Sequence, residues 1–159
     1  MEKVCHTLQP VFDKNSKVLI LGSIPSPVSR AKGFYYGHPQ NRFWRVLEAV
    51  FNEKIPDDID GKRAFLLEKR IALWDVISSC DIDGASDSSI KNAVPNDFSV
   101  IFSVADIKRV FTTGKTAHSL YRRFTGETPA LLPSPSPANC AVNFDALVSE
   151  YSVILNYLN

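Results

Sequence analysis

The amino-acid sequence predicts one α/β domain, a three-layer α/β/α sandwich with a central, mainly parallel four-stranded sheet. Short apolar runs alternate with amphipathic patterns along the whole chain, which is typical of alternating strands and helices. Each apolar run is followed by a turn signal, as expected for strands that are buried on both faces of a sheet. The chain has 159 residues, of which 45% are hydrophobic and 22% are charged, so we expect a single globular domain spanning residues 1–159.

Four apolar runs are the expected strands of this sheet: residues 18–21, 71–76, 109–113 and 130–132. Apolar side chains recur at helical spacing in three further segments: residues 43–51, 117–124 and 144–158. Asn143 is a candidate cap for the last of these helices. The polar stretch 81–96 is interpreted as a long loop that could include one helical turn.

The net charge of the chain is only +1, but its basic residues are unevenly distributed. No acidic residue occurs from position 14 to position 47, and this stretch contains six basic residues: Lys14, Lys17, Arg30, Lys32, Arg42 and Arg45. Residues 107–126 contain five more basic residues and no acidic one. A near-neutral protein can still present one basic face to phosphates, so we expect an anionic partner; a chance run of surface charges is the alternative.

Several classes of protein are not supported by the sequence. Cys5, Cys80 and Cys140 are odd in number and widely spaced, which favours neither a disulfide framework nor a zinc or iron–sulfur site. The three histidines also lack metal-ligand spacing, so no metal or organic cofactor is implied. No apolar run approaches the roughly 20 residues that a membrane span needs, and the N-terminus lacks the layout of a secretion signal. We therefore expect a cytoplasmic protein that does not associate with membranes.

Two loops that leave predicted strands are the main site candidates, because ligands of open α/β sheets collect at the carboxyl ends of the strands. The first loop breaks at Gly22 into a Ser/Pro segment and continues through an aromatic-rich connection. The second loop, LLPSPSPANCAVNF at residues 131–144, carries no charge and alternates prolines with serines. Its prolines stiffen the backbone, and its hydroxyl and N–H groups can hold phosphate oxygens. A rigid strand-to-helix connection is the alternative. The Gly-Lys-Thr sequence at 114–116 imitates a P-loop, but Arg109 stands where that motif requires glycine.

The first loop, GSIPSPVSRAKGFYYGHPQNRFWRVL at residues 22–47, resembles the first motif and following loop of the mismatch-specific branch of the uracil-DNA glycosylase superfamily. In that branch the strand ends in Gly-x-Asn-Pro, and the loop leads into His-Pro-x-Asn-Arg-Phe-Trp. The catalytic Asn of the first motif falls on Ile24, which has no polar atom to hold a water. With YYGHPQNRFW kept, this change resembles the hypoxanthine-DNA glycosylase family, whose working Asn is the one in His-Pro-x-Asn. Here that residue is Asn41.

The resemblance spans most of the chain. Residues 131–144 resemble the second motif of the superfamily, which pinches the DNA backbone and sends a wedge into the duplex, although the residues after Ser136 are small here. Residues 71–98 also look like the hypoxanthine-specific family. The resemblance implies a monofunctional DNA glycosylase that flips out and hydrolytically removes deaminated bases, hypoxanthine first. It would act as a monomer on double-stranded DNA, with single-stranded DNA a further candidate, and would be nucleoid-associated when bound.

Roles for individual residues follow from the resemblance. The candidate catalytic residues are Asn41 and His38. The candidate base-binding residues are Gly22, Ser23, Phe34 and Tyr36. The candidate DNA-binding residues are Ser26, Arg30, Lys32, Arg42, Ser134, Ser136 and Asn139. The chemistry would need an aromatic platform, hydrogen-bond donors for the negative charge that develops on the departing base, and a positioned water.

Each role has a plainer alternative. Asn41 directly precedes an apolar stripe and would suit a helix cap, and a His-Pro step at His38 would shape a turn. Asp75, at the end of a predicted strand, is well placed for a site residue but could equally cap backbone N–H groups. For the whole protein, the alternatives are removal of uracil or thymine from mismatches with guanine, and a lesion-binding domain that has lost its chemistry, as Ile24 would allow.

Overall fold

A parallel four-stranded sheet forms the centre of the protein in the computed structural model, which describes residues 1–5 and 7–159. The strands lie in the order β3-β2-β6-β7, with β3 at Ile71–Asp75, β2 at Val18–Gly22, β6 at Arg109–Thr113 and β7 at Ala130–Leu132. These are the four predicted strands, so the predicted α/β sandwich is confirmed. His6, one of the histidines without metal-ligand spacing, lies outside the described residues.

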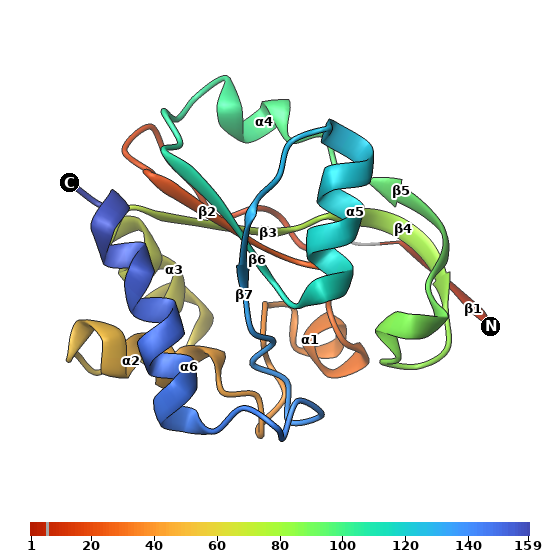
Figure 1. Cartoon of the computed structure of the whole chain (residues 1–159), viewed down its shortest axis with the longest axis horizontal. Coiled ribbons are helices and arrows are strands. Elements are labelled where there is room, and N and C mark those ends of the chain that lie inside the picture. The colour runs from red at the N-terminus through yellow and green to blue at the C-terminus, as the bar shows by residue number, and fades with distance from the viewer. Residues whose placement is uncertain (6) are drawn as a thin grey trace.

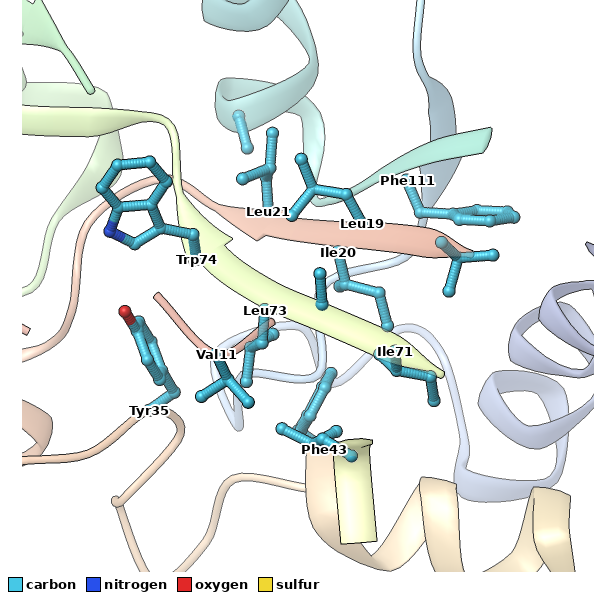
Figure 2. Close-up of a cluster of buried hydrophobic side chains, with 14 of the residues drawn as sticks. Val11, Leu19, Ile20, Leu21, Tyr35, Phe43, Ile71, Leu73, Trp74 and Phe111 are labelled. Atoms are coloured by element: carbon cyan, nitrogen blue, oxygen red, sulfur yellow. The ribbon is translucent and has the colours of Figure 1, made fainter. Parts of the chain in front are cut away.

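Helices cover both faces of this sheet (Figure 1). One side carries α2 (Phe43–Phe51), α3 (Ile59–Glu68) and α6 (Phe144–Tyr151), and the other carries α4 (Ser99–Phe102) and α5 (Lys115–Thr125). Leu19 and Leu21 of the central strand point to the α5 side, whereas Ile20 points toward Phe43 of α2 (Figure 2). Every residue of β2 is therefore buried, which is why this strand reads as a continuous apolar run.

The polar stretch 81–96 forms part of a second sheet, so its prediction as a long loop is wrong. Strands β1 (Glu2–Cys5), β4 (Ile77–Ile82) and β5 (Lys91–Pro95) pair antiparallel in the order β1-β4-β5. A 3₁₀ turn, η1 (Asp87–Ser89), lies between β4 and β5. Only one side of β4 is fully buried, and register shifts interrupt its pairing with β5, so the sequence lacks a clean alternation.

The corner between the two sheets also holds the first-motif loop. The N–H groups of Val76 and Ile77 donate to the carbonyl oxygens of Gly22 and Ser23 at 2.8 and 3.0 Å, so the pairing of β2 with β3 continues past the end of β2. The amide of Asn96 donates to the carbonyl oxygens of Asp75 and Ile77 at 2.9 and 3.3 Å. The loop after β2 is thus fixed by backbone hydrogen bonds.

The closing helix is shorter than the stripe at 144–158 predicts. Helix α6 ends at Tyr151 and continues as a 3₁₀ segment, η2 (Ser152–Tyr157). Because a 3₁₀ helix has three residues per turn, Ile154 becomes buried and Leu155 is 41% exposed. No helix in the described parts of the chain is both long and apolar enough to cross a bilayer.

Candidate active site at the carboxyl edge of the parallel sheet

A cavity of about 920 Å³ opens where the four parallel strands end. Both predicted site loops contribute to its wall, together with the segment that connects β4 to β5. Its lining includes residues 22–26, Tyr36, Asn41, Asp75, residues 84–88, 113–116 and 131–136, Asn139 and Glu150. The register of the sheet brings these segments together from distant parts of the sequence.

Gly22 and Asp75, which are register partners in β2 and β3, lie side by side in the cavity lining. Asp75 is only 4% exposed. A Cβ atom on Gly22 would lie 2.6 Å from Oδ1 of Asp75 and 3.2 Å from the hydroxyl of Tyr36. Glycine is therefore required here because a carboxylate and a phenol both approach the backbone closely.

Tyr36 is held in one orientation at the cavity wall. Its ring stacks on Phe43 with a centroid distance of 3.9 Å and an interplanar angle of 13°, and its hydroxyl lies 3.0 Å from Oγ1 of Thr113. Its backbone has a φ of +52°, an uncommon value for a residue with a side chain. Burial, followed by the nearby Asp75, raises the pKa of Tyr36 well above its usual range. The side chain is thus a neutral, braced platform.

Phe34, the neighbouring candidate for base binding, is not brought to the cavity. It is 4% exposed and stacks on Trp44 at a centroid distance of 5.9 Å. Tyr35 does line the cavity, but it is 2% exposed and donates from its hydroxyl to the carbonyl oxygen of Gln9 at 2.8 Å. Of the three consecutive aromatic residues, Tyr36 is the more exposed cavity residue and therefore the better candidate to contact a ligand.

Asn41 lies in the cavity with its amide orientation fixed. Its Oδ1 accepts a hydrogen bond from the N–H of Phe43 at 2.9 Å, which identifies the oxygen and leaves Nδ2 as the exposed donor. Nδ2 donates to none of the residues that the structure describes. Ile24 lines the same cavity and offers only carbon atoms. The helix-cap alternative for Asn41 is wrong, because Arg42 is the N-cap residue of α2. The bond to Oδ1 of Asn41 instead closes a turn ahead of the helix and leaves Nδ2 available to a ligand.

His38 does not line the cavity. Its Nδ1 accepts from the N–H of Gln40 at 3.1 Å, and its carbonyl oxygen accepts from the N–H of Asn41 at 2.9 Å. These bonds close the turn that presents Asn41, which matches the plainer interpretation of the His-Pro step.

Ser23 and Asp87 join the first-motif loop to the second sheet. The hydroxyl of Ser23, which is 7% exposed, donates to Oδ2 of Asp87 at 2.9 Å. Asp87 belongs to η1 and is exposed as a whole residue, but its carboxylate faces the cavity wall. Burial of that carboxylate raises its pKa, Asp75 raises it further, and the bond from Ser23 opposes the shift. Sequence reasoning missed Asp87 because its segment was interpreted as a plain loop.

The candidate DNA-binding residues fall into two groups. Ser26, Ser134, Ser136 and Asn139 line the cavity. Ser26 also caps α1 (Pro27–Lys32) by accepting from the N–H of Ser29 at 3.1 Å. Arg30 and Lys32 lie outside the cavity, where they donate to the carbonyl oxygens of Pro25 at 3.1 Å and Gly37 at 2.8 Å.

Sequence comparison with known proteins agrees with this arrangement. Residues 9–158 match the family model of the uracil DNA glycosylase superfamily. The chain belongs to this superfamily.

Relatives within the superfamily include two proteins named hypoxanthine DNA glycosylase, from Methanosarcina barkeri and Methanosarcina acetivorans. Each is 37% identical to this chain, over 130 and 133 residues respectively. The alignments cover 79% and 81% of this chain and 82% and 84% of the relatives. A solution NMR structure of an M. acetivorans protein, provisionally assigned as a uracil DNA glycosylase, has a TM-score of 0.80 and 32% identity. The structural match covers 96% of this chain and 97% of the M. acetivorans chain.

Arg42, a candidate DNA contact, is instead directed into the second-motif loop of this superfamily member. Its guanidinium donates to the carbonyl oxygens of Val142 at 2.5 Å, Ser136 at 3.1 Å and Asn139 at 2.9 Å, and its N–H donates to that of Pro135 at 3.0 Å. These donors are no longer available to a phosphate. The physical reason is that an uncharged, proline-rich loop has carbonyl groups that need donors. Arg42 therefore fixes the second-motif loop beside Asn41.

Lys115 and Thr113 are cavity residues that sequence reasoning did not select. Lys115 opens α5 immediately after Gly114, which has a φ of +92°. The sequence of this segment does not match a P-loop, but its place directly after a parallel strand does indicate a possible site.

We predict that Arg42→Ala lowers the free energy of unfolding by about 1–3 kcal/mol, because several loop carbonyl groups lose their donor. Hydrogen exchange of residues 133–142 should accelerate. The salt dependence of DNA binding should keep its slope, since no phosphate contact is lost. Arg45→Ala, at an exposed position of the same helix, is the matched control. A slope reduced by about one with unchanged stability would instead assign the guanidinium to a phosphate.

Proposed function

We propose that the protein is a monofunctional DNA glycosylase that excises hypoxanthine from DNA by hydrolysis of the N-glycosidic bond. The observation that carries this proposal is the position of Asn41, whose amide Nδ2 faces the cavity while the first-motif position holds the apolar Ile24. The names of the two relatives at 37% identity support the same substrate.

The cavity suits a base that has been flipped out of the duplex, a step that costs a few kcal/mol. The outer side of the Tyr36 ring would stack on the base, with Phe43 supporting the ring from behind. Because Phe43 is fully buried and Thr113 holds the phenol hydroxyl, the platform is already in place before the base arrives. A preformed platform reduces the entropy lost on binding.

Recognition of a deaminated base follows from a donor and an acceptor in the same cavity. Hypoxanthine presents an O6 acceptor beside an N1–H donor, whereas adenine presents an amino group beside a bare N1. In the proposed complex, Nδ2 of Asn41 donates to O6 and the carboxylate of Asp75 accepts from N1–H. Adenine would not fit this pair, because its amino group would face the Asn41 amide, also a donor, and its bare N1 would face the Asp75 carboxylate, also an acceptor. Uracil carries the same O4 and N3–H pattern, so it is the natural second substrate.

Asn41 would contribute to the rate as well as to recognition. As the glycosidic bond breaks, negative charge develops on the purine, and a fixed amide donor binds the charged base more strongly than the neutral one. The hydrogen bond from the Phe43 N–H holds the amide in this orientation without cost at the moment of reaction.

DNA binding would involve the rim of the cavity. Ser134 and Ser136 belong to a braced loop, in which the amide of Asn139 donates to the carbonyl oxygen of Ser134 at 3.0 Å. Lys115, which follows Gly114 beside Ser134, adds a positive charge to the cavity lining. We propose duplex DNA as the main substrate. Because the residues at 137–139 that would wedge into the duplex are small, single-stranded DNA would also be accepted. The active form would be a monomer.

We predict that the wild-type protein cleaves oligonucleotides containing inosine faster than those containing uracil or thymine. The measurement uses single-turnover incubation of fluorescent duplexes, and of matched single strands, followed by alkali. Cleavage restricted to uracil or thymine opposite guanine would assign a mismatch-specific enzyme. Binding to lesion DNA without cleavage of any substrate would assign a non-catalytic domain.

Asn41→Ala should lower single-turnover excision of hypoxanthine by at least ~100-fold, which corresponds to about 2.7 kcal/mol of transition-state stabilisation. Affinity for lesion DNA should fall much less, because phosphate contacts dominate it. Asn41→Asp keeps an oxygen for the Phe43 N–H but lacks the amide donor, so it should fold normally and remain inactive. Gln40→Ala, at the exposed neighbouring position, is the control.

A different result would reassign Asn41. If Asn41→Ala excises inosine at nearly the wild-type rate, with only a loss of stability of about 1 kcal/mol, the residue serves the turn alone.

A further inference from the structure

Hydrolysis of the glycosidic bond needs a group that receives a proton from water, and the residues considered so far do not supply one. Ile24 stands at the first-motif position and has no polar atom. The Oδ1 of Asn41 accepts from the N–H of Phe43, and an amide oxygen is too weak a base to take a proton near neutral pH. The proton acceptor must therefore lie elsewhere in the cavity.

Among the described residues, three carboxylates line the cavity: Asp75, Asp87 and Glu150. Asp75 lies next to Gly22, and in the proposed complex its carboxylate already binds N1–H of the base. Glu150 is exposed on α6 and also lines a separate surface depression with Val153 and Tyr157. Asp87 is the remaining candidate, and its carboxylate accepts a hydrogen bond from Ser23 of the first-motif loop.

The position of Asp87 next to the proposed place of the base suits an action at the sugar. A flipped nucleotide enters a pocket base first, because its sugar stays attached to the DNA backbone. In the proposed complex the base lies beside Gly22 and Asp75, and the sugar is joined to it. Ser23 follows Gly22 in sequence, and its hydroxyl donates to the carboxylate of Asp87 at 2.9 Å, so this carboxylate also lines the cavity near the base. We infer that Asp87 is the general base that activates the attacking water, an inference that rests on the proposed glycosylase function.

The reaction step balances without any further reagent. The water oxygen forms a bond to C1′ of the deoxyribose as the bond from C1′ to N9 breaks. The electron pair of that bond leaves with the base, and the water proton passes to the Asp87 carboxylate. The departing hypoxanthine anion takes a proton from solvent, and Asp87 returns its proton to solvent.

The electrostatic surroundings of Asp87 suit this role. Burial of the carboxylate raises its pKa, and the charge of Asp75 on β3 adds to the shift. A base is more effective when its pKa approaches the working pH. Tyr36 and Cys80, which also interact with Asp87, have pKa values raised by burial and remain neutral; Arg30 lies near Cys80.

Asp87→Asn separates catalysis from a purely structural tie, because asparagine keeps an oxygen for the Ser23 hydroxyl but cannot take a proton. We expect single-turnover excision of hypoxanthine to fall by at least ~100-fold. Affinity for a duplex with a non-cleavable inosine analogue should be unchanged. The wild-type rate should fall as the pH drops through the raised pKa of Asp87, and Asp87→Asn should lose this dependence.

Thermal stability gives an independent readout. A raised native pKa means that folding disfavours the charged carboxylate, so above that pKa the charge lowers stability. Asp87→Asn should therefore match or exceed the wild-type melting temperature near pH 7. If Asp87 served only to hold the first-motif loop through Ser23, Asp87→Asn would have a lower melting temperature than the wild type. Ser23→Ala breaks the bond but keeps the carboxylate, so it should retain the acid limb of the pH profile with a smaller loss of rate.

Asp83→Asn is the matched control, because Asp83 lies in the same segment and outside the cavity. Among the described residues, its carboxylate pairs only with the N-terminal amine, at 3.5 Å. An Asp87→Asn rate within about threefold of an active wild type would overturn the role of Asp87 and leave the glycosylase function intact. Absence of base excision by the wild type would overturn both.

Discussion

The register of the central strand β2 against its two neighbours is the constraint on which the site depends. Gly22 pairs with Asp75 of β3, and Leu21 pairs with Thr112 of β6, so Asp75 and Thr113 reach the same edge of the sheet. Because successive side chains of a strand point to opposite faces, a slip of one residue would move every side chain to the other face, disrupt the packing and break this alignment. The energy that stabilises the core thus also sets the floor of the cavity.

The walls depend on hydrogen bonds between segments that are far apart in sequence. Arg42 holds the second-motif loop across about a hundred residues, and Asn96 braces the corner that supports the first-motif loop. Both loops are rich in proline and have few regular partners of their own. Hydrogen bonds from other parts of the chain therefore hold both loops at the cavity. Two features of this region work against stability, as is common at functional sites. The backbone of Tyr36 lies in the left-handed region, and the carboxylate of Asp87 is partly buried.

The sequence predicted the parallel strands well because strands buried on both faces appear as apolar runs. It failed for β4 and β5, whose exposed side and irregular pairing hide the alternation. In the candidate site, family resemblance selected Asn41, Tyr36 and the serine-rich loop, all of which line the cavity. It could not distinguish Phe34 from Tyr36, because the directions of side chains two residues apart in a loop are decided by packing. Arg42 was assigned to DNA for its charge, whereas its partners are carbonyl groups of a loop that no local pattern connects to it.

The central claim is that the cavity receives a flipped deaminated base, and that Asn41 and Asp75 bind the hydrogen-bonding edge of this base. The most direct measurement is a crystal structure of the wild-type protein on a duplex that contains a non-cleavable inosine analogue. The account predicts hypoxanthine stacked on Tyr36, with O6 within hydrogen-bond distance of the Asn41 amide and N1 facing Asp75. An inosine that remains stacked in the duplex, or a flipped base held outside the cavity, would contradict it.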